Sequence, residues 1–162
     1  MQIQQQNVDK SLISQFDLLQ NLRQDDYNVC IIQELFVDFE GKTRANCQWT
    51  TVYPNTHREY PGKARSIILV NTDILTHAWK QINFQHPDIT TIGITGDISA
   101  LQYINTYNDG GNNKVLTHLS VFIRDRGRLV NSTHTLGGWF QPPPPALGWT
   151  QKCIFSHRKT WT

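Results

Sequence analysis

A short, uninterrupted apolar run, Val29–Ile32, is the feature that most constrains the fold of this chain of 162 residues. A run of this kind, without polar alternation, is typical of a strand that is buried on both faces of a sheet. Met1–Gln6 predicts a short strand more weakly, because four of its residues are glutamine. Further strands are predicted over Thr50–Tyr53, Ser66–Val70, Thr90–Thr95 and Leu101–Tyr107.

Two amphipathic helices accompany these strands. From Val8 to Leu22 apolar residues recur every three to four positions, and Asp25 and Asp26 end the pattern. Because strands follow one another as well as alternating with helices, the order favours α+β layers in one domain over strict βαβ winding. The second helix is predicted from Val115, Leu116, Leu119, Phe122 and Ile123, after a turn at Asn108–Gly111 and a cap at Asn112 or Asn113.

The composition alone excludes little. A net charge of +2 is too small to indicate a nucleic-acid partner, and basic clusters are more often solvated faces than phosphate contacts. Three cysteines without a C-x-x-C pair favour a reducing compartment. With no secretory leader and no apolar run long enough for a bilayer, the sequence indicates an intracellular protein without a membrane partner. The basic clusters are Arg124, Arg126 and Arg128, and Lys152, Arg158 and Lys159.

Polar side chains follow three of the apolar segments at the point where each ends. The stretches are Gln6–Asp9, Cys30–Glu34 and Asn105–Asp109. Side chains at strand ends converge on the rim of a sheet, where ligands commonly bind in layered folds. Taken singly, Asn7 is most often a cap or turn residue, Glu34 a surface acid and Tyr107 a rim aromatic. Together they are candidates for one site.

In this order, N-V-D, then I-Q-E, then a strand ending in tyrosine, the three stretches resemble the endonuclease/exonuclease/phosphatase superfamily. Other segments resemble more closely the endonuclease domain of fungal non-LTR (LINE-type) retrotransposons. The resemblance covers roughly Gln5 to Arg128 without a large gap. Its segments are Gln33-Glu34, Asp38-Phe39, Thr43–Asn46, Trp49, Val52–Pro54, Arg65–Asn71 and Tyr107–Gly110.

The resemblance implies a four-layer α/β sandwich and a phosphodiesterase that depends on Mg²⁺ (or Mn²⁺) and nicks target DNA in the nucleus. In such enzymes a residue like Glu34 holds the metal, and one like Asp9 lies near the ion. A residue like Asn7 orients the phosphate or the nucleophile, and one like Tyr107 contacts the scissile phosphate. The chemistry is coherent, because a hard divalent cation takes carboxylate oxygen and keeps several waters.

Two later motifs of the family are missing from this sequence. One is G-D-F-N, whose Asp activates the attacking water, and the other is an Asp-His pair. Where G-D-F-N is expected, the chain has Gly138-Trp139-Phe140-Gln141-Pro142. The resemblance therefore predicts an endonuclease domain that is inactive as this chain. The alternative is a non-catalytic remnant that binds DNA or protein and has a proline-rich adaptor tail.

The stretch WFQPPPPALGW, Trp139 to Trp149, gives a reason for the missing motif. Its residues require codons TGG TTY CAR followed by CCN four times. Beginning one base later, the same codons permit Gly-Phe-Asn-Arg-His-His-Pro and then Leu-Trp-Asp-Gly. In these retrotransposons G-D-F-N is usually followed by R-H-H-P-L-W-D, and the shifted reading is compatible with this string from its Phe to its last Asp. We therefore interpret the tail as an out-of-frame translation of the family's own motif. The alternative is a polyproline ligand for an aromatic-lined groove.

The predicted organisation is a partial endonuclease domain over residues 1–136 and an out-of-frame, disordered tail over residues 137–162. We expect the tail from Trp139 to Thr162 to lack packed structure, because a shifted frame carries no selected periodicity and Pro142–Pro145 lack backbone donors. The domain itself is expected to supply mainly the first sheet of the sandwich and its helices. The second sheet would be largely missing, and the inner face of the first would be uncovered.

Overall fold

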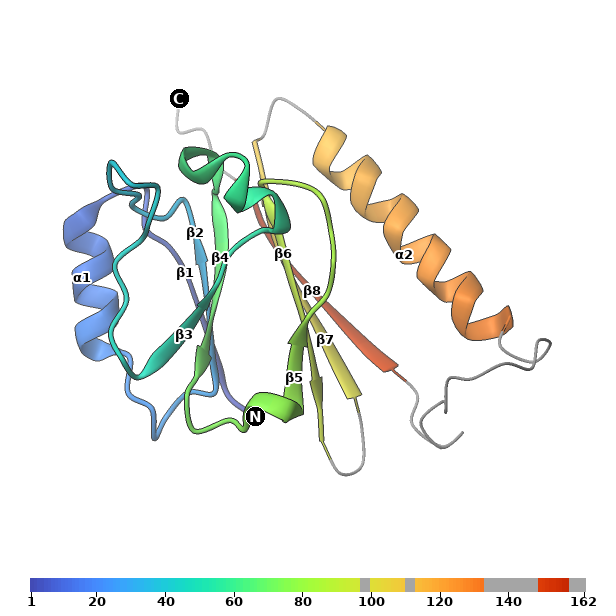
Figure 1. Ribbon diagram of the computed structural model, residues 1–162, viewed down its shortest axis with the longest axis horizontal. Helices are drawn as coiled ribbons and strands as arrows, with labels where there is room; N and C mark the ends of the chain where they lie inside the picture. The colour runs from blue at the N-terminus through green and yellow to red at the C-terminus, as the bar shows by residue number, and fades with distance from the viewer. Residues whose placement is uncertain (97–99, 110–112, 133–148, 158–162) are drawn as a thin grey trace.

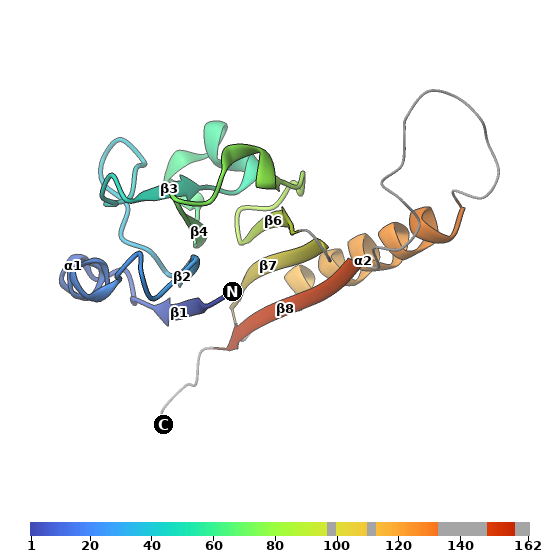
Figure 2. The same cartoon turned by 90° about the horizontal axis from the view of Figure 1, so that it is seen from below.

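Two four-stranded sheets face each other between two helices in the computed structural model (Figures 1 and 2). The structure describes residues 1–96, 100–109, 113–132 and 149–157. Helix α1 lies on the outer side of the first sheet and α2 on the outer side of the second (Figure 1). The α+β class predicted from the sequence is confirmed. In this described part, no helix has both the length and the apolar character needed to cross a membrane.

The first sheet has the strand order β1-β2-β4-β3. Strand β1 runs parallel to β2, while β4 is antiparallel to both β2 and β3. Every residue of β2 and β4 is buried, as the uninterrupted apolar runs predicted. The bounds are Ile3–Asn7 for β1, Val29–Gln33 for β2, Trp49–Val52 for β3 and Ser66–Asn71 for β4.

Helix α1, Leu12–Asn21, begins four residues later than the apolar spacing predicted. The backbone of Asp9 and Lys10 is left-handed, with φ of 49° and 56°, so the chain cannot be helical there. Ser11 then caps the helix by accepting a hydrogen bond from the N–H of Ser14 at 3.2 Å. Val8, which the spacing assigned to the helix, is instead buried in the core beneath it.

The second sheet has the order β5-β6-β7-β8. Its strands are Trp79–Gln81 (β5), Ile89–Thr95 (β6), Ala100–Asn108 (β7) and Trp149–His157 (β8), with short 3-10 turns at Asn55–Arg58, Pro61–Lys63 and Thr76–Ala78 before it. Strands β5, β6 and β7 are antiparallel, and β8 is parallel to β7. Helix α2, Lys114–Ser132, follows Asn113 and packs on this sheet through Val115 and Leu119.

The expectation that the second sheet is largely missing is wrong. The segments Thr90–Thr95 and Leu101–Tyr107, predicted correctly as strands, pair with each other instead of extending the first sheet. Their apolar side chains cover the inner face of the first sheet, in one buried cluster of Val29, Ile31, Val52, Ile68 and Val70 with Ile92, Ile94 and Tyr103. No uncovered inner sheet face therefore remains around this cluster.

The tail contains a strand that the sequence did not predict. Strand β8 pairs with the whole of β7, from Ala100 opposite Trp149 to Asn108 opposite His157. The expectation of no packed structure is wrong for these residues, because an edge strand offers backbone hydrogen bonds to any extended segment, whatever its side-chain pattern. The rest of that expectation, including Pro142–Pro145, lies outside the described residues. The domain boundary at residue 136 stays a prediction.

A buried amide network joins the two sheets at one end of the sandwich. The Nδ2 of Asn105 on β7 donates to the carbonyl oxygens of Ile32 at 2.9 Å and of Ile67 at 2.8 Å, in the first sheet. Its Oδ1 accepts from Nε2 of Gln33 at 3.1 Å. Asn105 and Gln33 are both fully buried. Since a buried polar group costs free energy when unpaired, this network holds the two strand ends in one relative position.

We predict that Asn105→Ala lowers the free energy of unfolding by about 3 kcal/mol, because it removes a donor from two buried carbonyls and leaves the Gln33 amide only its hydrogen bond to the Thr106 carbonyl. Urea denaturation followed by tryptophan fluorescence measures this. Asn83→Ala is the matched control, since Asn83 is exposed and should change stability by less than about 0.5 kcal/mol. Equal stability of the two variants would show that the network does not hold the sheets together.

Candidate active site

Glu34 lies at the point where β2 ends and is the centre of the candidate site. Its backbone is left-handed, with φ of 48°, and its side chain is buried, with an exposed fraction of 4% for the residue. Backbone hydrogen bonds fix this conformation: the Glu34 N–H donates to the carbonyl of Arg65 at 2.8 Å, and the Glu34 carbonyl accepts from the N–H of Lys10 at 2.6 Å. The carboxylate is thus held in place by its own backbone.

Two neutral donors bind the Glu34 carboxylate, one from each sheet. The Nδ2 of Asn7, at the end of β1, donates to Oε2 at 3.0 Å. The hydroxyl of Tyr107, on β7, donates to Oε1 at 2.8 Å. The sequence predicted Asn7 and Glu34 within about 8 Å of each other across a hydrated ion, with Tyr107 on the same rim. This proximity is confirmed; the catalytic roles of the three residues stay a prediction.

The backbone around the site is strained. Asp9, Lys10 and Glu34 are the only residues other than glycine with positive φ in the described part of the chain, and all three meet at this rim. Left-handed backbone costs a side-chain-bearing residue free energy, and such strain is concentrated at functional sites. It also orients Asn7, because the N–H of Asp9 donates to Asn7 Oδ1 at 2.9 Å and leaves the Nδ2 for Glu34.

Arg65 is a residue of the site that the sequence did not single out as functional. Its guanidinium lies 4.7 Å from the centroid of the Tyr107 ring. Its Nε and Nη2 donate to the two carboxylate oxygens of Asp88, each at 2.6 Å, and its Nη1 donates to Oδ2 of Asp109 at 3.3 Å. The only signal in the sequence was position. Arg65 directly precedes the buried strand β4, and Asp88 directly precedes β6 of the second sheet. Arg65 fixes the Tyr107 ring, and Asp88 neutralises Arg65.

The pKa of Tyr107 is raised to about 12, by burial first and then by its hydrogen bond to Glu34 and the charge of that carboxylate. The phenol therefore keeps its proton at neutral pH and acts as a donor. No Lys, Arg or His among the described residues forms an ion pair with Glu34. The rim thus holds a buried carboxylate whose charge is met by hydrogen bonds alone.

The oxygen donors at this rim suit Mg²⁺ or Mn²⁺ better than Zn²⁺ or Cu²⁺, which prefer imidazole and thiolate ligands. Within the ranges that the structure describes, no group of three or more His, Cys, Asp or Glu side chains could enclose an ion. Magnesium commonly takes only one or two carboxylates and completes its shell with water and substrate phosphate. Glu34 provides one carboxylate, and the exposed Asp9 lies two residues beyond Asn7, which donates to Glu34.

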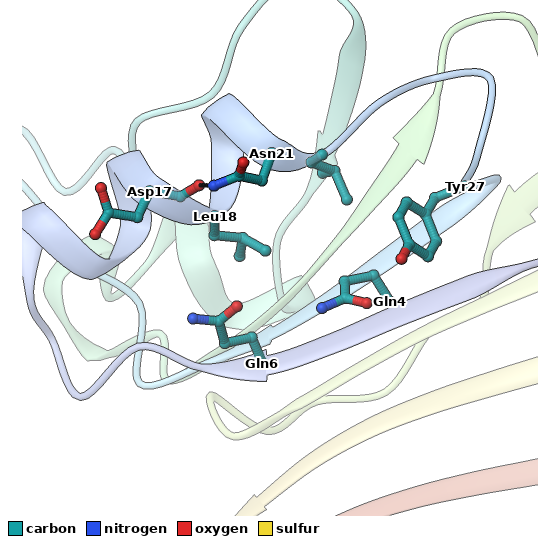
Figure 3. A pocket seen from close by; sticks show the side chains of 7 residues that line it. Gln4, Gln6, Asp17, Leu18, Asn21 and Tyr27 are labelled. Carbon is teal, nitrogen blue, oxygen red and sulfur yellow. Dashed lines mark hydrogen bonds between the residues drawn. The ribbon is translucent and has the colours of Figure 1, made fainter.

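A groove of about 570 Å³, here called the rim groove, opens beside Glu34. A second pocket, of about 250 Å³, lies apart from the rim between β1 and α1 (Figure 3). Figure 3 shows Gln4 and Gln6 of β1 opposite Asp17 of the helix, with no residue of the rim among the side chains drawn. Asn7, Glu34 and Tyr107 do not line the rim groove, but Lys10 and Arg65 do, and both are hydrogen-bonded to the backbone of Glu34. The rim groove is therefore the better candidate for a substrate. Its lining residues are Lys10, Leu35–Val37, Gly62–Arg65, Pro87 and Asp88.

Among solved structures, the chain resembles the endonuclease domain of TRAS1, a telomere-specific non-LTR retrotransposon. The match has a TM-score of 0.51 at 14% sequence identity and covers 92% of this chain and 57% of that one. The fold is nuclease-like. No protein-family model and no curated protein sequence matches the chain. The chain thus spans little more than half of the endonuclease domain that it resembles, and the closer likeness to fungal retrotransposons stays a prediction.

We predict that Tyr107 ionises near pH 12 and not near pH 10. In an ultraviolet titration of the five tyrosines, Tyr107→Phe should therefore remove the step near pH 12. Because the folded-state pKa lies above the ordinary value, the Tyr107 proton stabilises the fold fully below pH 10, and this stability is lost as the pH rises through about 12. In Glu34→Gln the pKa of Tyr107 should fall, since the neighbouring charge is gone. Loss of a phenol near pH 10 would contradict the hydrogen bond to Glu34.

Proposed function

We propose that the chain is the metal- and phosphate-binding portion of a metal-dependent DNA endonuclease domain of the retrotransposon type, acting in the nucleus. The observation that carries this proposal is the buried Glu34 carboxylate, which has two neutral donors and no ion pair. A buried charge without a counter-ion is costly unless a ligand compensates it. A divalent cation provides that compensation and can bind an anionic DNA phosphate at the same time, and the nuclease-like fold supports this choice of substrate.

Each residue of the rim has a distinct role in this proposal. Glu34 holds the cation with one carboxylate oxygen, and Asp9 provides a second acid close to it. Asn7 and the protonated Tyr107 are donors that can turn from the carboxylate to the oxygens of the scissile phosphate. When bound, the cation would polarise the phosphoryl group and offset charge on the departing oxygen.

The same proposal predicts binding without cleavage. Phosphodiester hydrolysis needs an activated water as well as a bound phosphate, and these groups act together, not additively. Neither the G-D-F-N motif nor the later Asp-His pair of the family is present in the sequence. General-base assistance contributes on the order of a hundred- to ten-thousand-fold in rate, so its loss alone makes turnover very slow.

We predict that Mn²⁺ or Mg²⁺ stabilises the chain through Glu34. At a hundred times its dissociation constant, a ligand that binds only the folded state adds about 2.7 kcal/mol to the free energy of unfolding. Glu34→Gln should abolish this increase in thermal or urea denaturation, because an amide is a poor ligand for either ion. Glu59→Gln, an exposed acid away from the rim, should keep it. If the ion raised the free energy of unfolding of Glu34→Gln as much as that of the wild type, Glu34 would not be the metal ligand.

We also predict no detectable nicking of supercoiled plasmid by the purified chain in Mg²⁺ or Mn²⁺. The reason is the missing activating group, whose loss costs positioning as well as proton transfer. Glu34→Ala, prepared in parallel, separates true activity from a contaminating nuclease. Nicking by the wild-type chain that the substitution abolishes would mean that the rim assembles a complete active site with groups other than those of the family motifs.

A further inference from the structure

We propose that Phe39 is a DNA-contacting residue that inserts between, or stacks on, bases a few nucleotides from the phosphate bound at Glu34. This inference rests on the proposed function and deepens it, because it names the surface that holds the DNA. Phe39 has an exposed fraction of 97%, more than any other large apolar side chain reported as exposed in the described residues. It lies five residues beyond Glu34 on the segment that leaves the site.

The turn that carries Phe39 is built to hold the ring in solvent. The N–H of Asp38 donates to the carbonyl of Lys42 at 2.8 Å, and the N–H of Gly41 donates to the carbonyl of Asp38 at 3.0 Å. The Asp38 carboxylate accepts from the N–H groups of Glu40 at 3.0 Å and Lys42 at 2.8 Å. With its backbone bonds made internally, the turn has a fixed shape, and Phe39 cannot fold back to be covered without breaking them.

The base of this turn is packed against the wall of the rim groove. Gly41 is buried with φ of 78°, and a Cβ added to it would lie 2.1 Å from Cβ of Pro61. Pro61 directly precedes the Gly62–Arg65 wall of the groove, and the opposite wall is formed by Leu35–Val37, just before the turn. Glycine at position 41 therefore permits a close approach that sets Phe39 beside the rim groove.

The charges of the rim groove suit a phosphate backbone. Lys10, Lys63 and Arg65 line it, and its one acid, Asp88, is already paired with Arg65. Neither Lys10 nor Lys63 forms an ion pair with a described acid, and both are exposed. A cationic groove with an aromatic side chain at its edge is the combination by which proteins follow a backbone and stack on its bases.

Distance along the chain limits where Phe39 can act. Five residues span at most about 18 Å when fully extended. At about 3.4 Å per nucleotide along one strand, Phe39 therefore reaches no further than about five nucleotides from the phosphate at Glu34. The two acids that flank Phe39 are engaged within the turn, since Glu40 is paired with Lys42 at 2.8 Å and Asp38 accepts the two backbone hydrogen bonds described above. A protein partner is less well suited, because protein interfaces place aromatic anchors in clusters, whereas no other large apolar side chain within five residues of Phe39 is reported as exposed in the described residues.

The test measures binding of a fluorescent DNA duplex to the full chain by anisotropy, with Mg²⁺ present. Phe39→Ala should weaken binding about 5- to 150-fold, as loss of one base–aromatic stack does, and should leave the salt dependence unchanged. Lys63→Ala should instead lower the slope of log affinity against log salt by about 1. Phe16→Ala is the matched control, since this phenylalanine is 46% exposed on α1, and it should bind like the wild type. Phe39→Trp should retain affinity.

The outcomes separate this inference from the proposed function. If the wild type binds DNA and Phe39→Ala binds within twofold of it, the inference is overturned and the proposed function stands. If the wild type fails to bind DNA, both are overturned. If Phe39→Ala weakens binding but Glu34→Gln keeps its stabilisation by Mn²⁺, the DNA surface is supported and the metal site is overturned. A duplex that carries 2-aminopurine within five nucleotides of a nick should become more fluorescent when the wild type binds, because the base unstacks. Phe39→Ala should not cause this increase in fluorescence.

Discussion

The amide of Asn105 is the interaction on which the candidate site depends. It joins β7 to the carbonyls of Ile32 and Ile67, so that the two sheets cannot slide past each other at this end. Glu34 directly follows Gln33, which is hydrogen-bonded to Asn105, and Tyr107 lies two residues beyond Asn105 on the same face of β7. The hydrogen bond between Tyr107 and Glu34 is therefore a consequence of the lock between the sheets. Apolar packing alone would not define this register, because it is non-directional.

The rim treats two buried carboxylates in opposite ways. Asp88 is paired with Arg65 through two contacts of 2.6 Å, which is the usual solution for a buried charge. Glu34, equally buried, accepts only neutral hydrogen bonds, although Arg65 lies close by against the Tyr107 ring. The fold thus directs the Arg65 guanidinium to Asp88 and away from the Glu34 carboxylate. Together with the left-handed backbone of Glu34, this arrangement stores free energy at the rim, which the cation of the proposed function would recover.

Much of the first sheet and the meeting of the three rim residues could be predicted from the sequence, and the reason is local. A continuous apolar run marks a buried strand, and the polar residue that ends the run marks the rim. The partner of each strand could not be predicted in this way. Thr90–Thr95 and Leu101–Tyr107 have the same periodicity whichever sheet they join, so the second sheet was missed.

Buried polar side chains were missed for a related reason. Gln15 is fully buried although it is not one of the apolar positions that predict the helix, because its amide donates to Thr43 and Arg44 and accepts from Phe36. Partners at such distances along the chain leave no periodic signal. The pairing of Arg65 with Asp88 was hidden in the same way, since the two residues are 23 positions apart and belong to segments that lead into different sheets.

In the proposed function, binding and cleavage are separable. Asn7, Glu34 and Tyr107 lie at the ends of β1, β2 and β7, and the network that locates them is complete within the first 109 residues. The group that activates water would belong to the family motifs that this sequence lacks, and the sheet lock does not involve them. Their loss would remove turnover and leave the rim folded, so selection on cleavage and selection on the fold would act on different parts of such a chain.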